Sequence, residues 1–181
     1  PISYLRFLIG IFGGLIWYVL FLFVLVLVFE TILMFVICDD LLAITMIDFD
    51  TMIIPDGLNI AMFIVSIVLM YVRHMSLLES IMGMFCISVP MILLNVLIAE
   101  SFGGGDIKLM FVSGIALGWK YSLLAAFIGI LLAGSYSIYL LVSKKINKKG
   151  HIAFGPYLSI GIFIALSYGS EIISWYLNLM M

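Results

Sequence analysis

The chain has 181 residues, of which 66% are hydrophobic and only 10% are charged. A soluble domain of this length cannot bury so much apolar surface, so the composition excludes a soluble protein and predicts an integral membrane protein in contact with the lipid bilayer. The formal net charge of −2 excludes a strongly basic surface, and we therefore expect no nucleic-acid partner.

Seven apolar segments follow one another along the chain, separated by polar or glycine-containing breaks. Their expected ranges are 7–29, 31–47, 57–72, 81–99, 107–117, 123–142 and 154–168. The first is long enough to cross a bilayer, and the second is interrupted by Asp39 and Asp40. We predict an all-α, polytopic transmembrane bundle of about six to seven spans, forming one domain over residues 1–181. The tail carries Trp175 and Tyr176, which suit an interfacial position.

The two cysteines give no sign of a metal site. Cys38 and Cys86 lie inside apolar segments and lack metal-ligand spacing, so we expect small core residues, with no disulfide, no metal and no cofactor. The chain starts at Pro1 and shows no cleavable signal peptide, so we interpret it as a fragment or a processed product.

Orientation follows from the cations. Four lysines crowd the break before the last segment: Lys144, Lys145, Lys148 and Lys149. The positive-inside rule puts this break in the cytoplasm. Counting backward then places the 48–56 break, the 103–106 break and the N-terminus with Arg6 on the cytoplasmic side. The tally is six cations inside, Lys108 among them, against two outside, which are Arg73 and Lys120.

Two aspartates stand where apolar segments meet polar breaks on this side. Asp48 ends the second segment, and Asp106 precedes the fifth. An acid at the edge of a bilayer is costly to desolvate, so each is a candidate functional residue. Two facing carboxyl groups cannot both ionise cheaply, so one can stay protonated as the acid while the other acts as the base. The pair predicts aspartic protease chemistry, in which the base activates water and the acid protonates the carbonyl oxygen or the leaving amine.

Simpler explanations exist for single charged residues near a helix end. Asp106 could be an N-cap, and Asp56 after Pro55 is a better candidate for a cap than for catalysis. Lys108 could face lipid headgroups or tune a nearby carboxylate.

Three successive glycines, Gly103, Gly104 and Gly105, precede Asp106. Glycine permits positive φ angles and lets another extended backbone approach closely. A peptide substrate could therefore dock here as an added strand. We expect Gly105 to tolerate a side chain less well than Gly103, which lies farther from Asp106 in the sequence.

Four motifs, in order, resemble the type IV prepilin peptidase family, a group of GxGD-type aspartic membrane proteases. The segment DFDTMIIPD at 48–56 resembles the first aspartate motif, and GGGDIKL at 103–109 resembles the second, GxGD. The segment FGPYL at 154–158 resembles the C-terminal FGP segment. The segments ISY at 2–4 and FLI at 7–9 resemble the entry to the first catalytic helix. The resemblance spans nearly the whole chain, and the ordered set is far more specific than a GxGD alone.

The resemblance implies an all-helical membrane peptidase of the bacterial inner membrane. It implies Asp48 and Asp106 as the catalytic pair and a cytoplasmic cut that removes the basic leader of prepilins or pseudopilins, after a glycine, in type IV pili or type II secretion. Supporting or substrate-binding residues are expected at Gly103, Gly104, Gly105, Lys108, Asp50, Asp56 and Glu100, the last matching an acidic position six residues before the second aspartate. Bacterial members commonly carry an N-terminal four-cysteine zinc segment linked to N-methylation, which these residues do not contain, so methylation is not predicted.

The chain departs from the family pattern at two places. Gly10 stands where the first helix usually has a glutamate, and Asp39 and Asp40 lie where the family is apolar or small. Asp40 is eight residues before Asp48 and shares its helical face, so it could line a hydrated cavity under the site or mark a break in the helix.

Three alternative functions compete with this prediction. A proton-coupled transporter would use intramembrane carboxylates as relays, but it would favour midplane acids and duplicated halves, which this sequence lacks. A non-enzymatic assembly factor would tolerate loss of either aspartate. An archaeal preflagellin peptidase-like enzyme would belong to the same reaction class.

Overall fold

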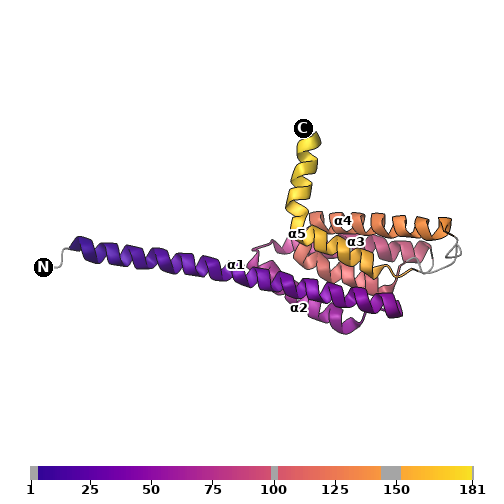
Figure 1. The fold of residues 1–181 in the computed structure, drawn as a ribbon, viewed down its shortest axis with the longest axis horizontal. Helices are drawn as coiled ribbons and strands as arrows, with labels where there is room; N and C mark the ends of the chain where they lie inside the picture. The colour runs from indigo at the N-terminus through magenta and orange to yellow at the C-terminus, as the bar shows by residue number, and fades with distance from the viewer. Residues whose placement is uncertain (1–3, 99–101, 144–151, 181) are drawn as a thin grey trace.

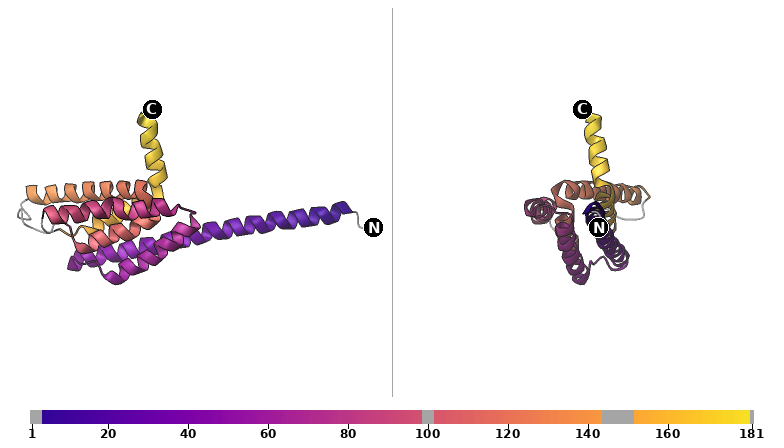
Figure 2. Two further views of the ribbon diagram at one scale, coloured as in Figure 1. Left: turned by 180° about the vertical axis from the view of Figure 1, so that it is seen from behind. Right: turned by 90° about the vertical axis from the view of Figure 1, so that its left-hand side faces the viewer.

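The computed structural model describes residues 4–98, 102–143 and 152–180. These residues form five helices: α1 (Tyr4–Thr51), α2 (Asp56–Val72), α3 (Leu77–Leu97), α4 (Gly104–Val142) and α5 (Gly155–Met180). No strand occurs in these ranges, so the prediction of an all-helical fold is confirmed. The helices lie side by side in a bundle, from which the N-terminal half of α1 and the C-terminal end of α5 project (Figure 1, Figure 2).

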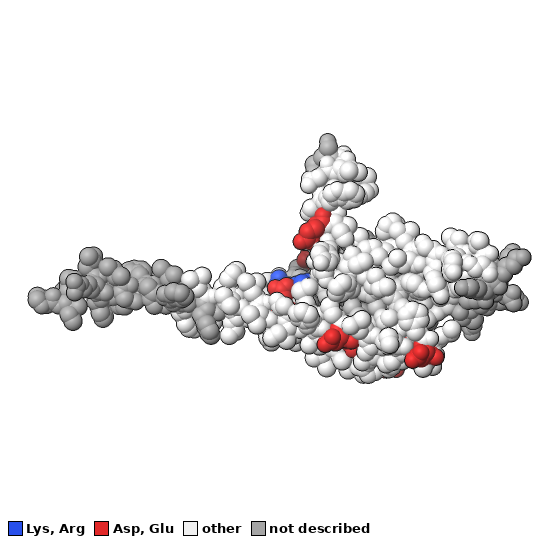
Figure 3. Space-filling model, in the orientation of Figure 1, with Lys and Arg blue, Asp and Glu red and all other residues white. Residues whose placement is uncertain are grey.

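The described helices have the length and composition of membrane spans. Residues 18–51 of α1, together with α3, α4 and α5, are long and apolar enough to cross a membrane, and α2 is a shorter apolar helix. The visible face of the molecule carries only a few charged groups (Figure 3). Large apolar side chains are exposed on the outside of the bundle, as expected where the solvent is lipid.

The helix boundaries correct the expected segmentation in two places. The segments 7–29 and 31–47 are one helix, α1, which continues through Glu30, Asp39 and Asp40. Arg73, at the end of α2, donates from Nε to Glu30 Oε1 at 2.7 Å, so this acid is satisfied without a loop. The segment 154–168 and the tail after it also form one helix, α5.

The expected break between the segments 107–117 and 123–142 is present at Gly118. Its φ of 68° and ψ of 173° interrupt α4, and glycine reaches this region without strain. The part of α4 after Gly118 runs back toward the beginning of α5. The rings of Tyr136 in α4 and Tyr157 in α5 lie 5.7 Å apart there.

Small residues allow α4 to pack closely against its neighbours. A Cβ at Gly83 of α3 would lie 2.8 Å from the Cα of Gly118, and a Cβ at Gly129 would lie 3.2 Å from the Cα of Leu158 in α5. Such close backbone approach is typical of helix pairs in membranes. α4 contacts α2, α3 and α5, while α1 contacts α2 and α5.

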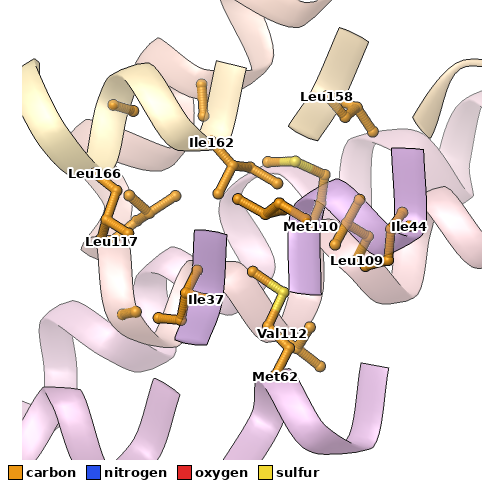
Figure 4. Close-up of a cluster of buried hydrophobic side chains, with 14 of the residues drawn as sticks. Ile37, Ile44, Met62, Leu109, Met110, Val112, Leu117, Leu158, Ile162 and Leu166 are labelled. Atoms are coloured by element: carbon orange, nitrogen blue, oxygen red, sulfur yellow. The ribbon is translucent and has the colours of Figure 1, made fainter. Parts of the chain in front are cut away.

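The core lies where α1, α2, α4 and α5 meet. Figure 4 shows its labelled side chains: Ile37, Ile44, Met62, Leu109, Met110, Val112, Leu117, Leu158, Ile162 and Leu166. The packing fixes the ends of these helices relative to one another. Thr51, Asp56, Gly104 and Gly155, at four helix ends, therefore lie at the same end of the bundle, with the Val142 end of α4 beside them.

Candidate active site

The two aspartates singled out from the sequence meet at this end of the bundle. Asp48 lies in the last turn of α1, and Asp106 lies in the first turn of α4. Their side chains are 4% and 8% exposed. Both line one cavity of about 410 Å³, and their carboxyl groups are close enough to interact electrostatically. Residues 58 positions apart in sequence thus form a buried acidic pair with access to a cavity.

Asp48 is held by the beginning of the last helix. The backbone N–H of Gly155, the first residue of α5, donates to Asp48 Oδ2 at 2.9 Å. A helix N-terminus carries unpaired N–H groups and partial positive charge, so it stabilises a carboxylate there. The approach is close: a Cβ on Gly155 would lie 2.7 Å from Oδ2 and 3.1 Å from Cγ of Asp48. Only a residue without a side chain fits this contact.

Gly155 was not among the candidate site residues identified from the sequence. The segment FGPYL was noted only for its family resemblance, and a glycine has no functional group to draw attention. The available signal was the Gly-Pro pair at the start of an apolar segment, because proline favours the first turn of a helix and glycine allows close approach. The partner 107 residues away could not be read from that signal.

Asp106 is fixed by the beginning of its own helix. The N-cap of α4 is Gly103, so the prediction that Asp106 could be the N-cap is wrong, and Asp106 is the third helical residue. From this position an acidic side chain can reach back to the backbone of the N-cap. Asp106 does so: its carboxylate interacts with the Gly103 backbone amide, and a Cβ on Gly103 would lie 2.9 Å from Asp106 Oδ2.

The glycines before Asp106 correct two expectations. Among the described glycines only Gly118 has a positive φ, and Gly103 has an extended conformation with φ −64° and ψ 142°. Gly103 is also the glycine of the three that lies nearest the Asp106 carboxylate, so its distance from Asp106 in the sequence does not make it tolerant of a side chain, whereas the low tolerance expected of Gly105 agrees with the crowding at its Cβ position. The Cβ position of Gly105 faces Ile54 Cβ at 2.8 Å, whereas that of Gly104 has no atom within 4 Å. Gly103 therefore leaves room for the Asp106 carboxylate, and Gly105 packs against the α1–α2 connection. The space at the Cβ position of Gly104 is empty.

We expect Gly103→Ala to reduce kcat strongly and Gly104→Ala to leave kcat near that of the parent. The methyl group at position 103 would push the Asp106 carboxylate aside, while at position 104 it enters open space. The two substitutions are chemically identical and adjacent, so each controls for the other. The measurement is the rate of peptide cleavage at saturating peptide and equal protein concentration; equal kcat values for the two variants would contradict this geometry.

Lys108 and Asp56 form an ion pair at the rim of the cavity. Lys108 Nζ lies 2.6 Å from Asp56 Oδ1, and the two side chains are 57% and 68% exposed. The prediction that Asp56 caps α2 is wrong, because the N-cap is Pro55 and Asp56 is the first helical residue. Lys108 thus pairs with Asp56 at the rim and makes no ion pair with either buried aspartate.

Asp56→Asn and Lys108→Met should have small effects. An exposed ion pair contributes at most about 1 kcal/mol to stability, because water screens it. We expect each variant to unfold at nearly the parent temperature in detergent and to keep most of the cleavage rate. A loss as large as that caused by replacing a buried aspartate would show that the pair takes part in the reaction.

The remaining candidates lie apart from the pair. Asp50 is exposed near the end of α1 and does not line the cavity, and Glu100 lies outside the described residues. Asp39 and Asp40 line a separate cavity of about 300 Å³ between α1 and α2, and no described residue bonds Asp40 Oδ2. Of the two alternatives considered for Asp40, a break in the helix is wrong, because α1 is continuous there. Among the described residues, no group of three or more His, Cys, Asp or Glu side chains could hold a metal ion.

Comparison with known proteins identifies relatives of one kind. The model of the type IV leader peptidase family matches residues 34–138. A prepilin leader peptidase/N-methyltransferase of Aeromonas salmonicida is 29% identical over 146 residues, covering 76% of this chain and 50% of that protein. The protein of the same name from Aeromonas hydrophila is 30% identical over the same shares.

A shorter match comes from another organism. The prepilin leader peptidase/N-methyltransferase of Bacillus subtilis is 35% identical over 77 residues, covering 42% of this chain and 31% of that protein. The chain thus spans about half the length of the Aeromonas relatives. No solved structure matches.

Proposed function

The chain belongs to the type IV leader peptidase family, and on that premise we propose that it is a membrane aspartic endopeptidase that removes the basic leader from type IV prepilins or pseudopilins. The observation that carries the proposal is the buried pair of Asp48 and Asp106 in one cavity at a helix-end face of the bundle. The relatives' names support leader peptides as the substrate class. We assign the peptidase activity to residues 1–181 as one domain, and no methyltransferase activity is proposed for them.

The reaction follows from two acids that share one cavity. One carboxylate takes a proton from a water molecule, which attacks the carbonyl carbon of the scissile peptide bond. The other carboxyl group, still protonated, stabilises the developing oxyanion by donating to it. The first carboxyl group then gives the proton that it took from water to the nitrogen of the leaving amine. The C–N bond breaks, and the second carboxyl group recovers its proton as the new carboxyl product forms. The Gly155 and Gly103 backbones hold the two side chains in place for this exchange.

The open glycine supports docking of an extended peptide. Gly104 lines the cavity, and nothing lies within 4 Å of its Cβ position. A substrate backbone can therefore approach the α4 N-terminus at Gly104 more closely than at any residue with a side chain. The strand-docking role proposed for the glycines belongs to Gly104, because Ile54 occupies the corresponding space at Gly105.

We expect the active site to face the cytoplasm, with the opposite end of the bundle outside. Arg73 and Lys120 both line a cavity of about 600 Å³ at that opposite end, which supports their assignment to one side. In a background with Cys38→Ala and Cys86→Ala, an impermeant thiol reagent applied to intact cells should label Lys120→Cys and miss Ile146→Cys. Labelling of position 146 in place of 120 would reverse the orientation and remove the cytoplasmic site.

Co-expression tests the proposed function in cells. A tagged prepilin and the protein are produced together in a bacterial host that lacks its own leader peptidase. Leader removal should appear as a faster-migrating prepilin and should require the protein. If a panel of prepilins and pseudopilins remains unprocessed while the protein is present in the membrane, the proposed substrate class is wrong.

A further inference from the structure

We infer that the groove between α1 and α5 binds the apolar helical segment of the substrate that adjoins the scissile bond. This inference rests on the proposed endopeptidase function and adds a binding site within the bilayer to it. The groove is a cavity of about 410 Å³, separate from the one lined by Asp48 and Asp106. Its lining residues are Cys38, Leu41, Leu42, Thr45, Ser159, Ile160 and Phe163.

The groove ends about one helical turn from Asp48 and Gly155 of the candidate active site. On α1, Leu41, Thr45 and Asp48 follow at spacings of four and three residues, so they share one side of the helix. On α5, Gly155, Ser159 and Phe163 are four residues apart. With a rise of about 1.5 Å per residue, the lining begins about 5 Å from Asp48 and extends to about 15 Å along α1. The two sides converge where the Gly155 N–H bonds Asp48.

The chemistry of the groove fits an apolar helix. Leu41, Leu42, Ile160 and Phe163 provide apolar contacts, and the Thr45 hydroxyl is used within α1 by donating to Leu41 O at 2.8 Å. A substrate whose scissile bond reaches Asp48 at the membrane face must place the following residues either in water or in the bilayer. This groove gives an apolar segment a place in the bilayer beside the site.

Ser159 points to a partner that can hydrogen-bond. Its side chain is 3% exposed, it lines the groove, and its Oγ has no hydrogen-bond partner among the described residues. A buried hydroxyl without a partner is unfavourable, so an occupant that moves the surrounding side chains apart and reaches Oγ would gain this hydrogen bond on binding. A lipid acyl chain offers no donor or acceptor, whereas a peptide helix offers small polar side chains and backbone carbonyls. Together with the continuity to Asp48, this favours a peptide as the occupant.

Site-specific photocrosslinking tests the position of the peptide. The probe is a synthetic peptide with a basic leader, a glycine at the cut and an apolar helix of about 20 residues after it. A photoreactive amino acid replaces Leu42 or Ile160 in the groove, or Ile64 or Phe127 on other exposed helix faces, in an Asp106→Asn background that preserves the peptide. Crosslinks to the peptide at 42 and 160, and few at 64 and 127, are expected. Equal yields at all four positions, or crosslinks only to lipid, would overturn the inference.

Ser159→Ala provides a second readout in the active protein. We expect a severalfold higher KM for the peptide with the apolar helix and an unchanged KM for a short soluble peptide with the same leader and cut. Ser66→Ala is the matched control, because Ser66 is also buried with an unpaired Oγ but lies on α2 outside the groove. A parent protein that cleaves both peptides, with Ser159→Ala and Ser66→Ala indistinguishable, refutes the groove. If the photoreactive variants crosslink at 42 and 160 but the parent cleaves neither peptide, the endopeptidase proposal is refuted instead.

Discussion

Asp48→Asn and Asp106→Asn should each reduce the cleavage rate by at least about a hundredfold, the lower range of what a general acid or base contributes. Asparagine keeps the size and shape of aspartate but cannot exchange a proton, so either substitution leaves the pair with one working member. Both residues are nearly fully buried in one cavity, and the other described acid that lines it, Asp56, is exposed at the rim and paired with Lys108, so it is not placed to replace them. The measurement is cleavage of a prepilin-like peptide by purified protein.

The control for these variants is insertion and folding. Neither substitution changes the apolar character of a helix, so both variants should be recovered from the membrane fraction at parent levels and elute as the parent does in size-exclusion chromatography. Asp50→Asn serves as a matched substitution, because Asp50 is exposed on the same helix and outside the cavity. Substantial turnover by either Asp48→Asn or Asp106→Asn would rule out the pair as assigned.

Gly155→Ala should cause a similar loss of activity without touching either acid. The added methyl group would lie 2.7 Å from Asp48 Oδ2 and 3.2 Å from Ile54 Cδ1, so the carboxylate must move away from the α5 N-terminus. The displaced atom is the end of a flexible side chain, and the change in unfolding temperature should therefore be small. The expected result is a loss in kcat with little change in KM, because the substitution moves a reacting group and leaves the peptide-binding surface intact.

Gly57→Ala is the comparison for this variant. Gly57 is also near the start of a helix at the same end of the bundle, but no atom lies within 4 Å of its Cβ position. It should keep the parent rate and gain a few tenths of a kcal/mol to about 1 kcal/mol in stability, because alanine is the better helix former. If Gly155→Ala were as active as Gly57→Ala, the hydrogen bond to Asp48 would have no role in positioning it.

The helical class and the break at Gly118 could be predicted, because they depend on long apolar runs and on a local change in composition. The break at Glu30 was predicted wrongly for the opposite reason. A charged residue inside an apolar run predicts a loop. Glu30 instead accepts a hydrogen bond from Arg73, 43 residues away, so its charge is paired and the helix continues. A partner so distant in sequence leaves no trace in the local pattern. Asp39 and Asp40 also lie inside the continuous helix α1, where they line a cavity between α1 and α2.

At the site, the sequence was sufficient for the two acids and insufficient for what holds them. Asp48 and Asp106 were found from charge and position alone, because an acid at the end of an apolar run is unusual. The capping roles expected of Asp56 and Asp106 were wrong, because the N-caps of α2 and α4 are Pro55 and Gly103, one and three residues earlier in the chain. The contact of Gly155 with Asp48 is a tertiary contact between a backbone group and a side chain, which no local pattern encodes.

We expect Asp48 and Asp106 together to hydrolyse the bond between a prepilin and its leader. The most direct test is mass spectrometry of a peptide with a basic leader, a glycine and an apolar helix, after incubation with the purified parent protein or with the double variant Asp48→Asn/Asp106→Asn. The parent should give two products, cut after the leader glycine, and the double variant should leave the peptide intact. Equal cleavage by both proteins, or intact peptide with a correctly folded parent, would contradict this expectation.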